Sequence, residues 1–290
     1  MFLSKRNKRI VLIVLGVVLT LCVALAVWAF VIEPDRLVVK EEAIAIRDWP
    51  PAFDHLRIVL ISDLHVGSPH ITIEKLRQIV ATINQQQADL VLIAGDFVIQ
   101  DVLGGEFVGP EAIAAELKNL RARDGVFAVL GNHDWWYDGE RIKGALSSAG
   151  IRMLENEVAQ IERDGRSIWI AGLADLWTRP QQINATLGKV KGQATIIALT
   201  HNPDIFPDIP PSVALTLAGH THGGQVNLPL IGRRIVPSQY KERYAIGHII
   251  ENGHHLYVTP GIGTSILPVR FRVPPEISVI TINSAASGER

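Results

Sequence analysis

Five short blocks of metal-binding residue types are scattered over the chain, and each block follows an apolar run. The blocks are Asp63-Leu64-His65, Gly95-Asp96, Gly131-Asn132-His133-Asp134, Thr200-His201-Asn202 and Gly219-His220-Thr221-His222-Gly223-Gly224. Imidazole and carboxylate ligands together suit Zn, Fe, Mn or Ni, and carboxylate-rich sites also admit Mn or Mg. Residues two apart in an extended segment point to the same side, so Asp63 and His65 form one ligand pair and His220 and His222 another. These residue types indicate metal binding.

The number of candidate ligands is too large for one ion. The set contains Asp63, His65, Asp96, Asn132, His201, His220 and His222. If one carboxylate is shared, this set suits two divalent ions. Paired ions roughly 3.5–4 Å apart are a common arrangement for in-line attack on phosphorus. Each block alone would read equally well as a turn or a polar surface segment, so the prediction rests on their joint occurrence.

Apolar strands must position these blocks. The patterns predict strands over 38–46, 56–62, 90–94, 126–130, 157–161, 167–171, 195–199, 213–217, 245–250, 255–258 and 277–282. They predict helices over 72–87, 110–123 and 138–149. Strands that alternate with helices indicate an α/β fold, in which the ligand crevice lies beyond the carboxyl ends of the strands. The blocks are therefore expected to converge in space.

In order and spacing, the five blocks resemble the calcineurin-like metallophosphoesterase superfamily. The resemblance spans about residues 56–260. It implies a four-layer β-sandwich flanked by helices, with two divalent metal ions at the strand ends. It also implies a metal-dependent phosphoric ester hydrolase. The identity of the ions (Mn, Fe or Zn) stays open.

The resemblance assigns a role to each block residue. It implies one ion held by Asp63, His65 and His222, a second held by Asn132, His201 and His220, and Asp96 as the bridge. His133 would face the substrate, stabilise the phosphorane and protonate the leaving oxygen. Asp134 would orient His133 through a hydrogen bond. The two ions would lower the pKa of a bridging water, and the resulting hydroxide would attack phosphorus.

Three further places in the sequence are candidates for substrate contact. The run Trp135-Trp136-Tyr137, with Trp135 as the chosen candidate, either lines the substrate cleft or packs in the core. Arg270 either binds a second phosphate of the substrate or lies on the solvent-facing side of a strand. His70 follows Ser-Pro, and we expect it to mark the entry to the helix of 72–87 rather than to approach the substrate.

The first 32 residues form a separate segment. Residues 10–32 contain no charged residue, and roughly 20 residues suffice to cross a bilayer as a helix. A cleaved signal peptide is the alternative, because the preceding residues are basic and Ala24-Leu25-Ala26 resembles a cleavage site. The length of the apolar run favours a retained single-pass anchor. Four basic residues precede the apolar run: Lys5, Arg6, Lys8 and Arg9. They favour a cytoplasmic N-terminus, with the catalytic part of the chain on the exoplasmic side.

The chain is predicted to have five parts. These are a basic tail (1–9), a transmembrane anchor (10–32), a linker with an edge strand (33–54), a metallophosphoesterase domain (55–283) and a tail (284–290).

Net charge and cysteine content argue against two classes of protein. The net charge of the whole chain is −1, which argues against a general nucleic-acid binder. A single cysteine excludes a disulfide framework. The oligomeric state is not indicated.

Two late motifs and the anchor make the resemblance closest to a bacterial membrane-anchored branch of the superfamily. The motifs are Gly261-Ile262-Gly263-Thr264-Ser265 and Pro268-Val269-Arg270-Phe271. That branch includes phosphodiesterases and enzymes that resemble UDP-2,3-diacylglucosamine pyrophosphatases. The leading hypothesis is thus a phosphodiesterase or pyrophosphatase that acts on a phosphoester, including a lipid-linked one. The alternatives are a phosphomonoesterase, including a phosphoprotein phosphatase, and a non-catalytic metal-binding membrane scaffold.

Overall fold

The computed structural model describes residues 5–192 and 194–285. The predicted basic tail and C-terminal tail therefore fall partly outside the described residues. Ser284, the first residue of the predicted C-terminal tail, is the last residue of a strand.

Six strands build the first sheet, in the order β1-β12-β2-β3-β4-β5. Their bounds are β1 (Val38–Ile46), β2 (Leu56–Ile61), β3 (Leu90–Ala94), β4 (Val126–Val129), β5 (Arg152–Met153) and β12 (Glu276–Ser284). β1 lies at the edge, as predicted, and pairs in parallel with β12. β2, β3 and β4 are mutually parallel, so their carboxyl ends meet at one edge of the sheet.

The second sheet also has six strands, in the order β10-β11-β9-β8-β7-β6. Their bounds are β6 (Glu157–Arg163), β7 (Arg166–Gly172), β8 (Thr195–Leu199), β9 (Val213–Ala218), β10 (Gly247–Glu251) and β11 (His254–Val258). Two hairpins form in this sheet, β6–β7 and β10–β11, and in their turns Asp164-Gly165 and Asn252-Gly253 each adopt two successive positive φ angles. This is the turn geometry whose twist matches that of paired strands.

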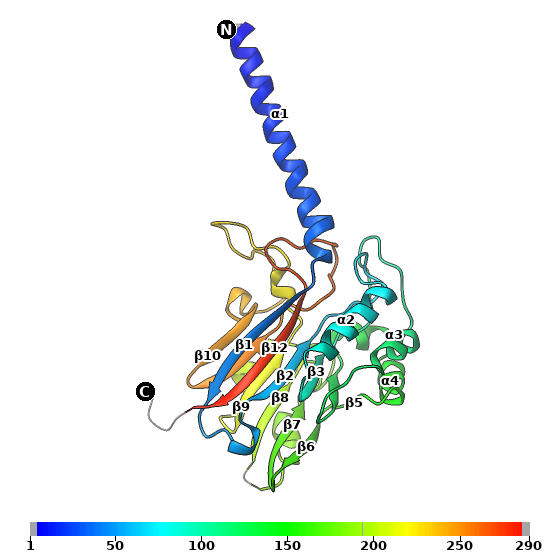
Figure 1. Ribbon diagram of the computed structural model, residues 1–290, viewed down its shortest axis with the longest axis vertical. Coiled ribbons are helices and arrows are strands. Elements are labelled where there is room, and N and C mark those ends of the chain that lie inside the picture. The colour runs from blue at the N-terminus through cyan, green and yellow to red at the C-terminus, as the bar shows by residue number, and fades with distance from the viewer. Residues whose placement is uncertain (1–4, 193, 286–290) are drawn as a thin grey trace.

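The two sheets face each other and helices cover their outer faces, which confirms the predicted four layers (Figure 1). An apolar core fills the space between the sheets, with Leu60 and Leu92 from one and Leu199 and Leu217 from the other. The outer face of the first sheet packs against α2 (Ile73–Gln85), α3 (Pro110–Leu117) and α4 (Asn132–Ser148). The second sheet is covered by α5 (Ile183–Leu187) and the 3-10 helix η4 (Pro203–Asp208).

Two helices differ by six residues at one end from their predicted bounds, whereas α2 differs by one or two residues at each end. α3 ends at Leu117 rather than 123, because the chain turns back there, and the backbone N–H groups of Arg123 and Asp124 bond to residues 88 and 89. α4 begins at Asn132, six residues before the predicted start. The prediction found only its second part, because the helix is kinked at Asp138, where φ is −166° and ψ is 82°.

The N-terminal segment is helical and projects from the sandwich (Figure 1). It comprises α1 (Lys5–Val27), a π-helical turn η1 (Trp28–Ile32) and a 3-10 turn η2 (Glu33–Asp35). Together these 31 residues are long and apolar enough to cross a membrane by length and composition. None of the residues of α1 is buried against the domain, so the hydrophobic side chains face outwards along its whole length.

Candidate metal centre

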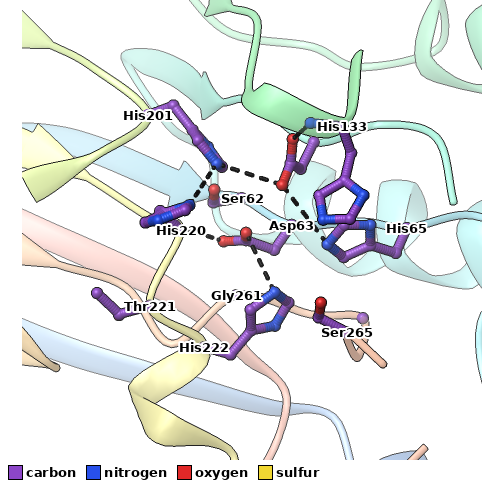
Figure 2. A network of polar contacts seen from close by, with 12 residues as sticks. Ser62, Asp63, His65, His133, His201, His220, Thr221, His222, Gly261 and Ser265 are labelled. Atoms are coloured by element: carbon purple, nitrogen blue, oxygen red, sulfur yellow. Dashed lines mark hydrogen bonds and ion pairs between the residues drawn. The ribbon is translucent and has the colours of Figure 1, made fainter. Parts of the chain in front are cut away.

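The five blocks converge at one end of the sandwich, as the strand pattern predicts (Figure 2). Asp63 follows β2 and Asp96 follows β3, while His201 and His220 follow β8 and β9 of the facing sheet. Backbone hydrogen bonds hold neighbouring blocks together: the N–H of Asp63 donates to the carbonyl of Gly95 at 2.9 Å. The site therefore lies where the ends of both sheets meet.

The first group of ligand atoms comes from Asp63, His65 and His222, and these atoms lie within 4.8 Å of one another. His222 Nε2 is 3.4 Å from Asp63 Oδ1. The rings of His65 and His222 are stacked, with centroids 5.2 Å apart. His65 Nδ1 lies 3.1 Å from the carbonyl oxygen of Val98, a contact that orients the ring with Nε2 towards the centre.

The second group comes from Asp96, His201 and His220, again within 4.8 Å. His201 Nε2 is 3.2 Å from Asp96 Oδ2, and it is 3.1 Å from both Asn132 Oδ1 and His220 Nδ1. Asp96 Oδ2 is also 3.7 Å from Nε2 of His65, a member of the first group. The carboxylate of Asp96 thus lies between the two groups.

The polar atoms of the site fit divalent cations. Buried polar atoms in proteins normally have hydrogen-bond partners. Among the described residues, four buried ligand atoms have no hydrogen-bond partner: Asp63 Oδ1, His65 Nε2, His220 Nε2 and His222 Nδ1. A bound cation would satisfy such atoms, and the mixed imidazole and carboxylate set suits transition metals.

Burial makes most of the imidazoles in the site neutral. It lowers the pKa of His65 to about 4 and the pKa of His222 well below its usual value. Neutral imidazole is the form that binds metal. His201 is different: burial lowers its pKa, but the nearby carboxylates of Asp96, Asp63 and Asp175 together outweigh burial and raise its pKa well above the usual value. A cation would therefore displace a proton from the His201–Asp96 pair.

The backbone at the site is unusual. Left-handed φ angles occur at Asp63 (51°), His65 (41°), Asp96 (58°), His220 (69°) and His222 (50°). Such angles are uncommon for residues with a side chain and persist only where the surrounding structure holds them. Five of the seven predicted ligands therefore sit in conformations that are typical of functional sites.

Two glycines let the backbone approach the ligands closely. A Cβ atom on Gly219 would lie 1.9 Å from Ser62 Oγ and 2.8 Å from Asp63 Oδ2. A Cβ atom on Gly261, in the first late motif, would lie 2.7 Å from Asp63 Cβ. Any larger residue at either position would push on Asp63.

Comparison with known proteins decides the family. A family model of the calcineurin-like phosphoesterases matches residues 56–224. The chain belongs to this family. The metallophosphoesterase YkuE of Bacillus subtilis, described as uncharacterized, is 33% identical over 89% of this chain and 89% of its own length. The phosphodiesterase YaeI of Escherichia coli is 31% identical over 78% of this chain and 82% of its own length.

A third relative is itself named as a transmembrane protein. A transmembrane protein with metallophosphoesterase domain from Danio rerio is 29% identical over 94% of this chain and 63% of its own length. Together with the family match, the relatives identify a metal-dependent hydrolase of phosphoric esters. The long apolar helix is consistent with a membrane span in this calcineurin-like phosphoesterase.

The position of Asp134 in this phosphoesterase corrects its predicted role. The structure shows its carboxylate accepting hydrogen bonds from the backbone N–H groups of Asp96 (2.8 Å), Phe97 (2.9 Å), Val98 (3.3 Å) and Gly131 (3.0 Å). Among the described residues, no hydrogen bond joins it to His133. Asp134 therefore holds the loops that carry the ligands, because its fully buried carboxylate accepts hydrogen bonds from backbone N–H groups that follow both β3 and β4.

The two predicted roles of the aromatic run divide between its residues, since Trp136 lines the cleft and Trp135 packs on the core. Trp135 is half-buried and packs against the core under the helices, with the Arg179 guanidinium 3.9 Å from its ring centroid. A cavity of about 420 Å³ over the site is instead lined by Trp136, Trp177 and His133. His133 and Trp136 are three residues apart on α4 and so share a helix face. The sequence did not indicate which tryptophan faces the cleft, because the predicted helix began at residue 138.

Arg270 is neither a strand-surface residue nor free to bind phosphate. Its side chain is fully buried, and its guanidinium donates to the backbone carbonyls of Pro260 (3.0 Å), Gly261 (3.2 Å), Gly263 (2.5 Å) and Val273 (3.0 Å). It thereby braces the glycine motif behind Asp63. The prediction was wrong because β12 begins only at Glu276, so strand alternation does not apply to Arg270.

Proposed function

We propose that this phosphoesterase hydrolyses phosphodiester or pyrophosphate bonds at a membrane surface with two divalent cations bound. The observation that carries the proposal is the position of Asp96 Oδ2, which lies 3.2 Å from His201 and 3.7 Å from His65. A carboxylate shared by two sets of ligands is what a two-metal centre requires.

The proposal divides the ligands between two cations. Asp63, His65 and His222 would hold one, Asn132, His201 and His220 would hold the other, and Asp96 would serve both. When bound, such cations supply positive charge that neutralises the phosphate and activates water. Mn, Fe and Zn all suit this ligand set.

The surroundings of His133 support its proposed role as the general acid. Its backbone N–H donates to Asp96 Oδ1 at 2.9 Å, which fixes the residue beside the ligands. Its ring stands edge-on to His65 (centroids 4.8 Å apart) and to Trp136 (5.0 Å), and it forms part of the cavity wall. From this position His133 can protonate the leaving oxygen of a phosphoester held over the ligands.

The shape of the cavity supports a substrate with an organic group beyond the phosphate. The rings of Trp136 and Trp177 are stacked with centroids 6.4 Å apart, and Trp177 contacts the His220 ring at 4.3 Å. Flat aromatic faces beside the ligands can pack against a sugar, base or other leaving group. This supports a diester or pyrophosphate over a simple monoester.

The N-terminal helix supports action at a membrane and a lipid-linked substrate, because it would confine the enzyme to the bilayer surface. The basic residues before the apolar run favour a cytoplasmic N-terminus and an exoplasmic catalytic domain. A reporter fused after Arg290 would test this orientation, and a cytoplasmic signal would reverse it.

The test of the reaction uses the full chain in detergent with Mn²⁺. We expect bis-p-nitrophenyl phosphate to be hydrolysed at least tenfold faster than p-nitrophenyl phosphate, with two ions bound per chain. Asp96→Asn should lose both ions and activity, whereas Asp138→Asn, a change of an exposed carboxylate on α4, should retain both. A preference for the monoester would favour the phosphomonoesterase alternative. Two bound ions without any hydrolysis would favour the scaffold.

A further inference from the structure

Exposed apolar side chains gather on two loops beside the active site. We call them the apolar rim, which consists of Leu228, Leu230, Ile231, Ile235, Ile266 and Leu267. Leu230 and Ile266 are 108% and 71% exposed. Leu228, Ile235, Ile266 and Leu267 line one shared groove of about 300 Å³, so these four residues form a continuous surface, and Leu230 and Ile231 lie on the loop between Leu228 and Ile235. Continuous exposed apolar surfaces mark sites of interaction.

Backbone and side-chain hydrogen bonds hold the rim in place. Val226 and Phe271 form a β-bridge that joins the two loops. Gln225 accepts a hydrogen bond from the N–H of Ser265 at 2.7 Å through its side chain. The N–H of Leu103, which is itself exposed, donates to the carbonyl of Ile266 at 3.0 Å. The rim is thus an ordered part of the fold.

Two highly exposed residues of the rim have strained backbones. The φ angles of Leu230 and Ile266 are 65° and 63°. The left-handed region is particularly unfavourable for a β-branched residue such as Ile266. In these conformations the apolar side chains of Leu230 and Ile266 point away from the domain, where contact with water does not stabilise them. Contact with an apolar medium would stabilise them.

The membrane-spanning segment ends directly beside the rim. The N–H of Arg270 donates to the carbonyl of Ala29 at 2.9 Å, and the N–H of Val273 donates to Glu33 Oε1 at 2.8 Å. Glu33 is buried and also accepts from Trp28 Nε1 at 2.6 Å. The end of the apolar helix is therefore fastened to the same segment that carries Ile266 and Leu267. Figure 1 shows these loops around the base of α1.

The charge of the two loops suits a lipid surface. Residues 226–236 and 265–272 contain no aspartate or glutamate, and two of their arginines, Arg234 and Arg272, are exposed. Basic residues next to apolar ones are attracted to anionic lipid headgroups. A water-soluble protein partner would not need the rim to lie level with the end of the membrane helix.

The rim also continues into the active site. The catalytic cavity and the groove of the rim share Gly224, Gln225, Ile235, Ser265 and Ile266 as lining residues. A molecule that lies along the rim would therefore reach His133 and the metal ligands without leaving the protein surface.

We propose that the apolar rim inserts into the lipid leaflet beside the anchor and that the active site takes its substrate from that leaflet. The substrate class is an amphiphilic phosphoester whose hydrocarbon chain lies along the rim while its phosphate reaches the ligands. The substrate class in this inference rests on the proposed function, whereas the insertion of the rim into the leaflet is independent of it.

Insertion is tested with fluorescent labels on the full chain. Cys22 is the single cysteine, so Cys22→Ala combined with Leu230→Cys or Leu267→Cys allows attachment of one environment-sensitive dye. Ile250→Cys is the matched control, because Ile250 is 58% exposed but lies on β10. In phosphatidylethanolamine–phosphatidylglycerol vesicles, spin-labelled lipid should quench the dye at 230 and 267 at least threefold more than at 250. Equal quenching at all three positions would overturn insertion, as would energy transfer between labelled copies without lipid quenching.

The substrate class is tested with two diesters that share a leaving group: ethyl and hexadecyl p-nitrophenyl phosphate. In vesicles, we expect kcat/KM to be at least tenfold higher for the hexadecyl ester. Leu230→Ser with Ile231→Ser should reduce that preference at least fivefold and leave ethyl ester turnover within twofold, and Ile250→Ser should change neither. Equal use of both esters by the unmodified chain would refute entry from the leaflet. Hydrolysis of neither would refute the proposed function itself, and lipid quenching would still decide insertion.

Discussion

Replacing Asp134 by asparagine should destabilise the domain and weaken metal binding together. The carboxylate accepts from four backbone N–H groups: Asp96 and Gly131 on Oδ2, Phe97 and Val98 on Oδ1. The amide of asparagine can accept on one side only, so its NH₂ group would face two donors. A hydrogen bond to a charged group contributes roughly 1.5–3 kcal/mol. Losing two such hydrogen bonds lowers the free energy of unfolding by roughly 3–6 kcal/mol, and removing the cost of burying a charge offsets part of this loss.

We expect a net loss of about 3 kcal/mol, which corresponds to a fall of roughly 6–12 °C in Tm for a domain of this size. Burial and the nearby charge of Asp96 raise the pKa of Asp134 to about 7, so the comparison is made at pH 8, where the carboxylate is ionised. The full chain is melted in detergent with EDTA and with Mn²⁺, and bound metal is measured by elemental analysis. Because the variant displaces the ends of β3 and β4, metal affinity should fall at least tenfold.

The control is Asp138→Asn on the same helix. Asp138 is exposed and accepts from the N–H of Arg141 at 3.1 Å, a contact that asparagine can keep. Its Tm should stay within about 1 °C of the unmodified chain, since surface substitutions usually change stability by no more than about 0.5 kcal/mol. If Asp134→Asn kept its Tm and metal content while turnover alone fell a hundredfold, our account would be wrong. Asp134 would then act through His133 after all.

Two other substitutions test separate parts of the site, and a third tests Glu155, a buried carboxyl group that accepts a hydrogen bond from the N–H of Leu130 at 2.6 Å. His133→Asn should keep both ions and its Tm but slow turnover by roughly 10²–10⁴, the usual contribution of one acid–base group, and loss of metal would show that His133 is a ligand instead. Gly219→Ala should lower stability by about 1–3 kcal/mol and weaken metal binding, because its Cβ would lie 2.8 Å from Asp63 Oδ2, and an unchanged melting curve would contradict this. Burial raises the pKa of Glu155 from 4.5 to about 7, so the stability it contributes is fully present below pH 4.5 and is lost as the pH rises through 7. As the pH rises from 5 to 8, the free energy of unfolding of the unmodified chain should therefore fall by about 2 kcal/mol more than that of Glu155→Gln, as measured by chemical denaturation. Parallel pH profiles of the two proteins would exclude the effect.

The sequence alone determined which residue types form the centre and roughly where they meet. Metal binding depends on the chemistry of the side chain, and that chemistry is fixed by residue type. Asp63 and Asp96 follow apolar strands that are parallel neighbours, and parallel strands end at one edge of a sheet. The sequence predicted the apolar helix equally well, because length and absence of charge are properties of one continuous segment.

Only the tertiary structure decided what Asp134, Arg270 and the two tryptophans do. The donors to Asp134 lie 36 to 38 residues away at Asp96–Val98 as well as at Gly131 nearby, and no local pattern announces them. The burial of Arg270 depends on carbonyls of the glycine motif and on where β12 begins. Trp136 rather than Trp135 faces the cavity because α4 starts at Asn132.

The apolar rim shows the same division between sequence and structure. Leu230 and Ile266 look like ordinary apolar residues, and residue type alone predicts burial for both. Their exposure depends on a left-handed backbone and on the bridge between Val226 and Phe271, which are 45 positions apart in the sequence. Partners and side-chain directions of this kind depend on contacts between distant segments, and these exist only once the chain has folded.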